Sequence, residues 1–90
     1  MQIWKHPLKI EQMQTIQIPQ GATVLCVQAQ NGLPCVWFKC DPDNDLMPRR
    51  ILTFVTGEEC EGKGAGHYIG TYQLGGGSFV AHVFECAWDI

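Results

Sequence analysis

The chain has 90 residues, of which 46% are hydrophobic and 17% charged, and its formal net charge is −3. This length supports a single domain with a modest core, so we expect one β domain over residues 1–90. Its six lysines and arginines are scattered rather than gathered into a basic stripe, which argues against nucleic acid as a partner. No segment has a signal-peptide apolar run or approaches the roughly 18 apolar residues of a membrane span, so we expect no membrane association.

The cysteines indicate the redox compartment. Their number is odd and no secretory signal precedes them, which favours reduced thiols in a cytoplasm. A zinc site begins with a close pair of cysteines or histidines, and the chain has none. We therefore expect no metal and no cofactor; a site assembled from distant residues such as His67, His82 and Cys86 is the alternative. The five cysteines are Cys26, Cys35, Cys40, Cys60 and Cys86.

Side chains alternate with a period of two through most of the chain, and no segment of ten residues keeps a helical period, which predicts an all-β fold. The first expected strand carries Trp4, His6, Leu8 and Ile10 in one parity, and Pro7 within it indicates an edge position or a break. A short second strand is expected at residues 16–18.

Residues 22–30 and 33–40 are predicted to form a hairpin, because Asn31-Gly32 between two alternating runs favours a type I′ turn. In the expected register, one face of this hairpin is apolar and belongs to the core. The opposite face is amphipathic. The predicted core set is Leu25, Val27, Ala29, Val36 and Phe38, and the predicted opposite set is Val24, Cys26, Gln28, Gln30, Cys35, Trp37 and Lys39.

Three more strands follow an acidic turn at residues 41–48. Residues 49–56 are apolar on both faces and predict a central strand. Residues 67–74, a glycine turn at 75–77 and a long strand at 78–88 complete the chain. Seven strands at this spacing predict a small, mostly antiparallel sandwich or a compact barrel.

Catalytic residues are poorly represented, and we predict that the protein is not an enzyme. Ser78, the only serine, follows a triple glycine, where a hydroxyl is hard to position as a nucleophile. His82 shares a strand parity with Val80, Phe84 and Trp88, which favours a packed or interfacial histidine. The alternative is an acid–base pair between His82 and a glutamate.

Two blocks of the sequence carry a family resemblance. IPxGAxxLxVQxQNGxPCxW and YIGTxQxxGGxxVxHVFE resemble a family of small proteins of unknown function encoded by tailed bacteriophages and prophages. The resemblance extends from about Lys5 to Glu85. It implies a phage or prophage gene product in the cytoplasm of a bacterial host, and it implies no activity. The family often continues Thr56-Gly57 with His-Pro, whereas this chain has Glu58 next, so no role of that histidine is carried over.

Our first functional hypothesis is that the chain is a non-enzymatic accessory protein that binds a host or phage protein. It would act as an inhibitor or an adaptor, and its targets would include components of host defence. The expected contact is the amphipathic hairpin face with Gln28, Gln30, Trp37 and Lys39, because tryptophan is enriched in interface cores. The alternative for Trp37 is burial beneath another strand or a second sheet.

A second hypothesis is a binder of a small anionic ligand, such as a sponge for a signalling nucleotide. Arg49 and Arg50 would contact the anion, and Trp37 or Tyr72 would stack on the base. On an alternating strand only one of the two arginines faces a given pocket.

We also expect a homodimer. Lys5, Pro7 and Lys9 protect the first strand as a sheet edge, whereas the last strand has no such protection and is apolar on both faces. Its apolar residues are Phe79, Val80, Val83, Phe84 and Trp88.

Overall fold

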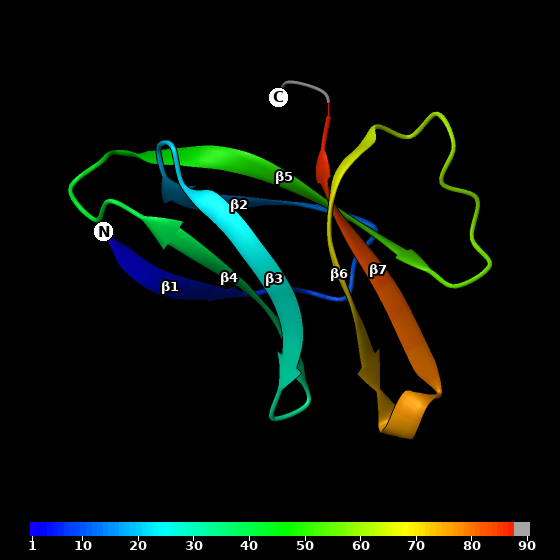
Figure 1. Cartoon of the computed structure of the whole chain (residues 1–90). Helices are drawn as coiled ribbons and strands as arrows, with labels where there is room; N and C mark the ends of the chain where they lie inside the picture. Colours follow the sequence, from blue (N-terminus) through cyan, green and yellow to red (C-terminus); the bar gives the residue numbers. More distant parts are fainter. Residues whose placement is uncertain (88–90) are drawn as a thin grey trace.

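The alternating sequence forms seven β-strands in the computed structural model, which describes residues 1–87 (Figure 1). All strand pairs are antiparallel, and a single 3-10 turn at Gly75–Gly77 joins the last two strands. The predicted all-β class is thereby confirmed. The strands are β1 (Gln2–Pro7), β2 (Met13–Pro19), β3 (Thr23–Gln30), β4 (Leu33–Cys40), β5 (Leu46–Val55), β6 (Ala65–Leu74) and β7 (Phe79–Cys86).

The strands form a three-stranded sheet, β1-β4-β3, and a four-stranded sheet, β2-β5-β7-β6. Buried aliphatic and aromatic side chains from both sheets form one core. At one side of the molecule β3 lies beside β6 (Figure 1). This approach requires a glycine, because a Cβ on Gly70 would lie 3.0 Å from Val27 Cγ1 and 3.5 Å from the Val27 nitrogen.

The predicted hairpin turn is confirmed, since Asn31 and Gly32 have φ angles of 52° and 78°, the positive values that a type I′ turn needs. The predicted faces are wrong at the start of the first strand and at Ala29. A β-bulge between Val24 and Cys26 shifts the register, so Val24 points into the core and Leu25 is 46% exposed. Beyond the bulge Val27 points into the core as expected, but Ala29, which we also assigned to the core, is exposed because it lies at the end of the hairpin next to the turn.

The central position of β5 is confirmed, because it lies between β2 and β7 and its Ile51 and Leu52 are both buried. The expectation for the last strand is wrong, because β7 lies between β5 and β6 and both of its edges are hydrogen-bonded. The argument for a homodimer from an unprotected β7 edge therefore fails. Trp88, which we placed on the same strand, lies outside the described residues.

The first strand is an edge strand, as Pro7 predicted. It ends at Pro7, and the Leu8 nitrogen then donates a hydrogen bond to the Pro34 oxygen at 2.9 Å. The side chains expected on one face of this strand point inward as far as Leu8, which is buried. Ile10, which we placed on the same face, is 58% exposed in the connection to β2. The proline thus ends the strand rather than interrupting it.

Candidate functional site

The outer face of the three-stranded sheet gathers the predicted hairpin residues. In the register of β3 on β4, Gln28 pairs with Cys35 and Gln30 with Leu33, while Cys26 pairs with Trp37. Paired residues in an antiparallel sheet share a face. We call this surface the Trp37 face; it comprises Ile3, Lys5, Pro7, Thr23, Cys26, Gln28, Gln30, Leu33, Cys35, Trp37 and Lys39.

Trp37 lies at the middle of this face and is half-buried. The Lys5 ammonium lies 5.5 Å from the centre of the Trp37 ring and also donates a hydrogen bond to Gln30 Oε1. A cation at this distance interacts favourably with an indole face. The Trp37 Nε1 is buried and has no acceptor within residues 1–87. Such an unpaired donor costs about 1–3 kcal/mol.

The Trp37 face combines a positive charge with exposed apolar groups. Lys5 and Lys39 lie on it, and none of its members is an aspartate or a glutamate, although the whole chain carries a net charge of −3. Ile3 and Leu33 are 65% and 60% exposed. A surface of this kind suits a partner that offers carboxylates around an apolar contact.

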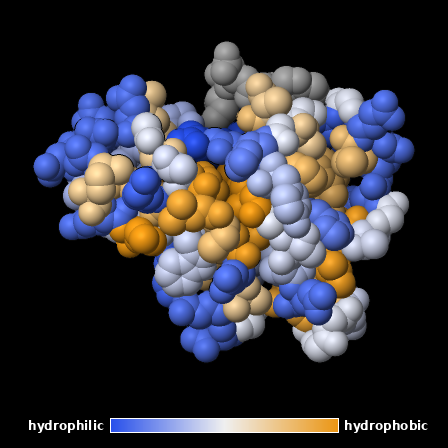
Figure 2. Space-filling view, in the orientation of Figure 1, coloured by the Kyte–Doolittle hydropathy of each residue, from blue (hydrophilic) through white to orange (hydrophobic). Residues whose placement is uncertain are grey.

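Apolar surface is also gathered elsewhere on the molecule. Figure 2 shows an apolar patch near the centre of the visible face, over the middle of β3 and toward β6, with hydrophilic side chains around it. The bulge in β3 contributes to the exposed apolar surface of that strand, because it turns Leu25 outward.

The two arginines lie on opposite faces of β5. Arg49 forms an ion pair with Glu85 and donates a second hydrogen bond to the Ala22 oxygen at 3.0 Å. Both charged side chains are about three-quarters buried, with exposures of 25% and 21%. Arg49 thus joins β5 to β7 and to the start of β3. Arg50 is half-buried and pairs with Thr15 of β2.

Tyr72 lies in the core with an exposure of 3%. Its ring is tilted against Phe79 with the centroids 6.3 Å apart, and its hydroxyl has no partner in the described chain. Burial raises the pKa of the Tyr72 hydroxyl, because the phenolate is poorly solvated there. In this position the ring presents no free face for a ligand.

His82 lies on the outer face of the four-stranded sheet. Its Nε2 is 2.7 Å from Thr56 Oγ1, its Nδ1 is 2.9 Å from Thr71 Oγ1, and Thr71 Oγ1 is 2.5 Å from the Tyr68 hydroxyl. Both ring nitrogens therefore bond to threonine hydroxyls, and no glutamate is bonded to the imidazole. Beside this network, Phe84 contacts two further rings, with centroids 6.1 Å from Phe54 and 5.4 Å from Tyr68. We call this surface the His82 face; it comprises Phe54, Thr56, Tyr68, Thr71, His82 and Phe84.

The residue that sequence reasoning missed is Lys5. Its pairing with Trp37 depends on β1 lying next to β4, a contact between segments about thirty residues apart. The one available signal was parity, because Lys5 alternates with the inward-facing Trp4 and His6. That signal places Lys5 on an outer face but does not name its neighbour.

Over residues 1–87, no three histidine, cysteine or acidic side chains are gathered in a way that could hold a metal ion. The same part of the chain contains no helix that is long and apolar enough to span a membrane.

Comparison with other proteins places the chain in a family. Searches of curated proteins and of solved structures find no match. A match to one family covers residues 1–88, which is nearly the whole chain. The protein therefore belongs to the family described as Domain of unknown function (DUF7352).

Proposed function

We propose that the protein is a non-enzymatic accessory protein of phage or prophage origin, which acts in the host cytoplasm by binding another protein on the Trp37 face. The observation that supports this most strongly is the state of Trp37. Within residues 1–87 its indole N–H is buried without an acceptor, and the exposed Lys5 side chain lies over its ring.

The chemistry of Trp37 suits a binding anchor. Tryptophan supplies more binding energy than most residues when it is desolvated at the centre of an interface. Displacing the exposed Lys5 side chain gives a partner access to the ring, and an acceptor from that partner would satisfy the Nε1 proton. The exposed amides of Gln28 and Gln30 border the same area and supply hydrogen bonds at its rim.

The charges of the face favour an acidic partner surface. Lys5 and Lys39 would both approach the partner, and no carboxylate of the Trp37 face offsets them. Opposite charges on the partner raise the association rate and fix its orientation. Because such steering is screened by salt, we expect binding to weaken as ionic strength rises.

The nucleotide-sponge hypothesis has less support from the geometry. Arg49 is committed to Glu85 and to the Ala22 carbonyl, and Tyr72 is buried. The remaining groups proposed for it, Arg50 and Trp37, belong to different sheets.

The test is quantitative capture from bacterial cells that carry the phage or prophage, with three tagged proteins. We expect the wild type and Tyr68→Ala to retain one protein in equal amounts, because Tyr68 is an exposed aromatic of the other sheet. We expect Trp37→Ala to lose that protein. Equal recovery by all three would contradict the proposal.

A purified version of the same test identifies a self-interface. If light scattering shows a dimer that only Trp37→Ala dissociates, the partner on this face is an identical subunit. Loss of binding in Tyr68→Ala, with Trp37→Ala unaffected, would move the interface to the His82 face and overturn the proposal.

A further inference from the structure

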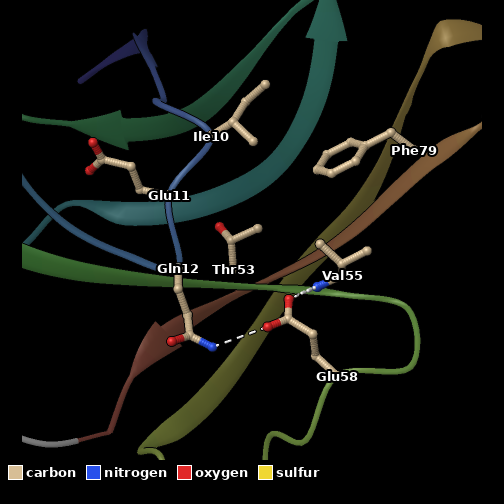
Figure 3. Close-up of a pocket in the computed structure, with 7 residues that line it drawn as sticks. All are labelled: Ile10, Glu11, Gln12, Thr53, Val55, Glu58 and Phe79. Atoms are coloured by element: carbon tan, nitrogen blue, oxygen red, sulfur yellow. Dashed lines mark hydrogen bonds between the residues drawn. The ribbon is translucent and has the colours of Figure 1, made fainter.

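A small pocket opens at one end of the sandwich, away from the residues proposed above. It lies between the β1–β2 connection, the end of β5 and the start of β7, and has a volume of about 100 Å³ (Figure 3). This is well below the roughly 300–1,000 Å³ of sites for drug-sized ligands, so a nucleotide does not fit. Its lining residues are Ile10, Glu11, Gln12, Thr53, Val55, Glu58 and Phe79.

The pocket contains an unsatisfied polar group. Thr53 is 5% exposed, and its buried Oγ1 has no hydrogen-bond partner in the described chain. In Figure 3 its side chain stands on β5 and points toward the β1–β2 connection, among the lining residues. A buried hydroxyl without a partner is uncommon in folded proteins, and it indicates that something absent here completes it.

The other polar side chains of the lining are Glu11, Gln12 and Glu58. Glu58 accepts hydrogen bonds from the Val55 nitrogen at 2.7 Å and from Gln12 Nε2 at 3.4 Å (Figure 3). Each carboxylate oxygen has a second lone pair, so Glu58 can accept further donors. Glu11 also lines the pocket, but its carboxylate points away from the other lining side chains (Figure 3), and the lining contains no lysine, arginine or histidine. The lining therefore carries negative charge and no positive charge.

Apolar side chains form the rest of the wall. Ile10, Val55 and Phe79 supply a surface that a short alkyl chain can cover, and the Phe79 ring also suits a cation. A hard metal ion prefers six or more oxygen ligands and gains nothing from such walls. A cation with an apolar stem uses both properties of the site.

We infer that this pocket binds a primary alkylammonium group, with the alkyl chain along Ile10 and Phe79 and the ammonium protons shared between Thr53 Oγ1 and the Glu58 carboxylate. Two sources have this chemistry: the side chain of a lysine in a polypeptide, and a free primary amine. The site is separate from the Trp37 face and does not depend on the function proposed for that face.

The direct test is an NMR titration of the ¹⁵N-labelled protein with n-butylammonium, n-butanol and butyrate. With five non-hydrogen atoms, n-butylammonium should bind with roughly millimolar affinity. We expect saturable shifts at Thr53, Val55 and Phe79, and we expect n-butanol to bind about tenfold more weakly. Butyrate should not bind. Equal affinity for n-butanol and n-butylammonium, or no saturable shift with either, would overturn the inference.

Three variants separate the site from a cavity that only holds water. Thr53→Val keeps the shape of the side chain and should weaken n-butylammonium binding about tenfold. Glu11→Gln should weaken it about threefold, because its carboxylate is exposed. Glu59→Gln removes a nearby acid that does not line the pocket, and should have no effect. Unchanged affinity in Thr53→Val, with the fold intact by NMR, would show that the ammonium does not use the Thr53 hydroxyl and would contradict the inference.

The two sources are distinguished with Nα-acetyl-lysine methylamide as the probe. If it binds at least as tightly as n-butylammonium, the pocket accepts a lysine from a polypeptide. If it binds more than about tenfold more weakly, the mouth of the pocket excludes a peptide backbone and a free amine is the ligand. Either result supports an ammonium site.

Discussion

The outer faces of the two sheets differ in how their polar groups are satisfied. On the His82 face, both imidazole nitrogens of His82 bond to threonine hydroxyls, and the Tyr68 hydroxyl continues the chain. On the Trp37 face, Trp37 Nε1 is buried without an acceptor, and Lys39 has no hydrogen bond within the described chain. The first face is complete in the isolated protein, whereas the second is not.

This difference separates two uses of aromatic residues in a small β domain. Rings that contact other rings beside a closed hydrogen-bond network stabilise the fold. A ring with an unpaired donor beneath an exposed lysine is better explained by a partner than by stability. Substitutions on the two faces should therefore affect different measurements.

The largest expected effect lies between the faces, at Arg49. Arg49→Met leaves the Glu85 carboxylate largely buried and unpaired, so we expect the free energy of unfolding to fall by about 2–3 kcal/mol. Lys39→Met, which removes an exposed cation from the Trp37 face, should change it by less than about 0.5 kcal/mol. Urea denaturation of both variants measures the contrast. Equal losses would show that Arg49 is no more structural than a surface lysine.

The next effect concerns binding. Trp37→Ala should weaken binding of the protein partner by at least about 2 kcal/mol, or roughly thirtyfold in Kd, because a central tryptophan anchor is lost. Its free energy of unfolding should change less than its binding energy, since the ring is only half-buried. Isothermal titration with the captured partner gives the first number and urea denaturation the second. If Trp37→Ala strongly lowers the free energy of unfolding but its folded fraction binds the partner with normal affinity, Trp37 is a structural residue and not a binding anchor.

His82→Ala tests the His82 face in the same way. It removes two hydrogen bonds from a closed network, so we expect a loss of about 1–2 kcal/mol in unfolding free energy and no change in partner binding. His82→Asn retains one donor and one acceptor, and should recover part of the loss. Abolished biological effect with an unchanged melting temperature would instead indicate an acid–base role for His82.

The smallest effect is at Tyr72. Tyr72→Phe removes a buried hydroxyl that has no partner within residues 1–87, and should raise the free energy of unfolding by up to about 1 kcal/mol at neutral pH. The pH dependence follows from its raised pKa: above about pH 10 the unfolded chain loses the tyrosine proton before the folded chain does, so stability falls as pH rises.

The matched control is Tyr68→Phe. Tyr68 is 52% exposed and bonded to Thr71, so its substitution should not raise stability. Denaturation at neutral and alkaline pH measures both variants. A loss of stability in Tyr72→Phe would mean that the Tyr72 hydroxyl is satisfied after all.

Much of the fold follows from the sequence, because alternation and turn residues act locally. Asn31 and Gly32 predict the hairpin turn, and the apolar run around Ile51 predicts a central strand. The bulge at Leu25 was not predictable from alternation, since both Val24 and Leu25 are apolar and either could face the core. Strand order was also not predictable, which is why β7 was expected at an edge.

The candidate site was predicted in part. The shared face of Gln28 and Trp37 follows from the hairpin register, because local pairing decides it. The contact between Lys5 and Trp37 does not follow from the local sequence, because it depends on the long-range pairing of β1 with β4. The ion pair of Arg49 was not predictable, because its partner Glu85 lies 36 residues away in the sequence. Arg49 was therefore assigned to ligand binding.

The most direct test of the account is the affinity of the captured partner for the wild type, Trp37→Ala and Tyr68→Ala, measured by titration on proteins that NMR shows to be folded. The account predicts that Trp37→Ala binds at least about thirtyfold more weakly and that Tyr68→Ala binds as the wild type does. Equal affinities for the wild type and Trp37→Ala would contradict it.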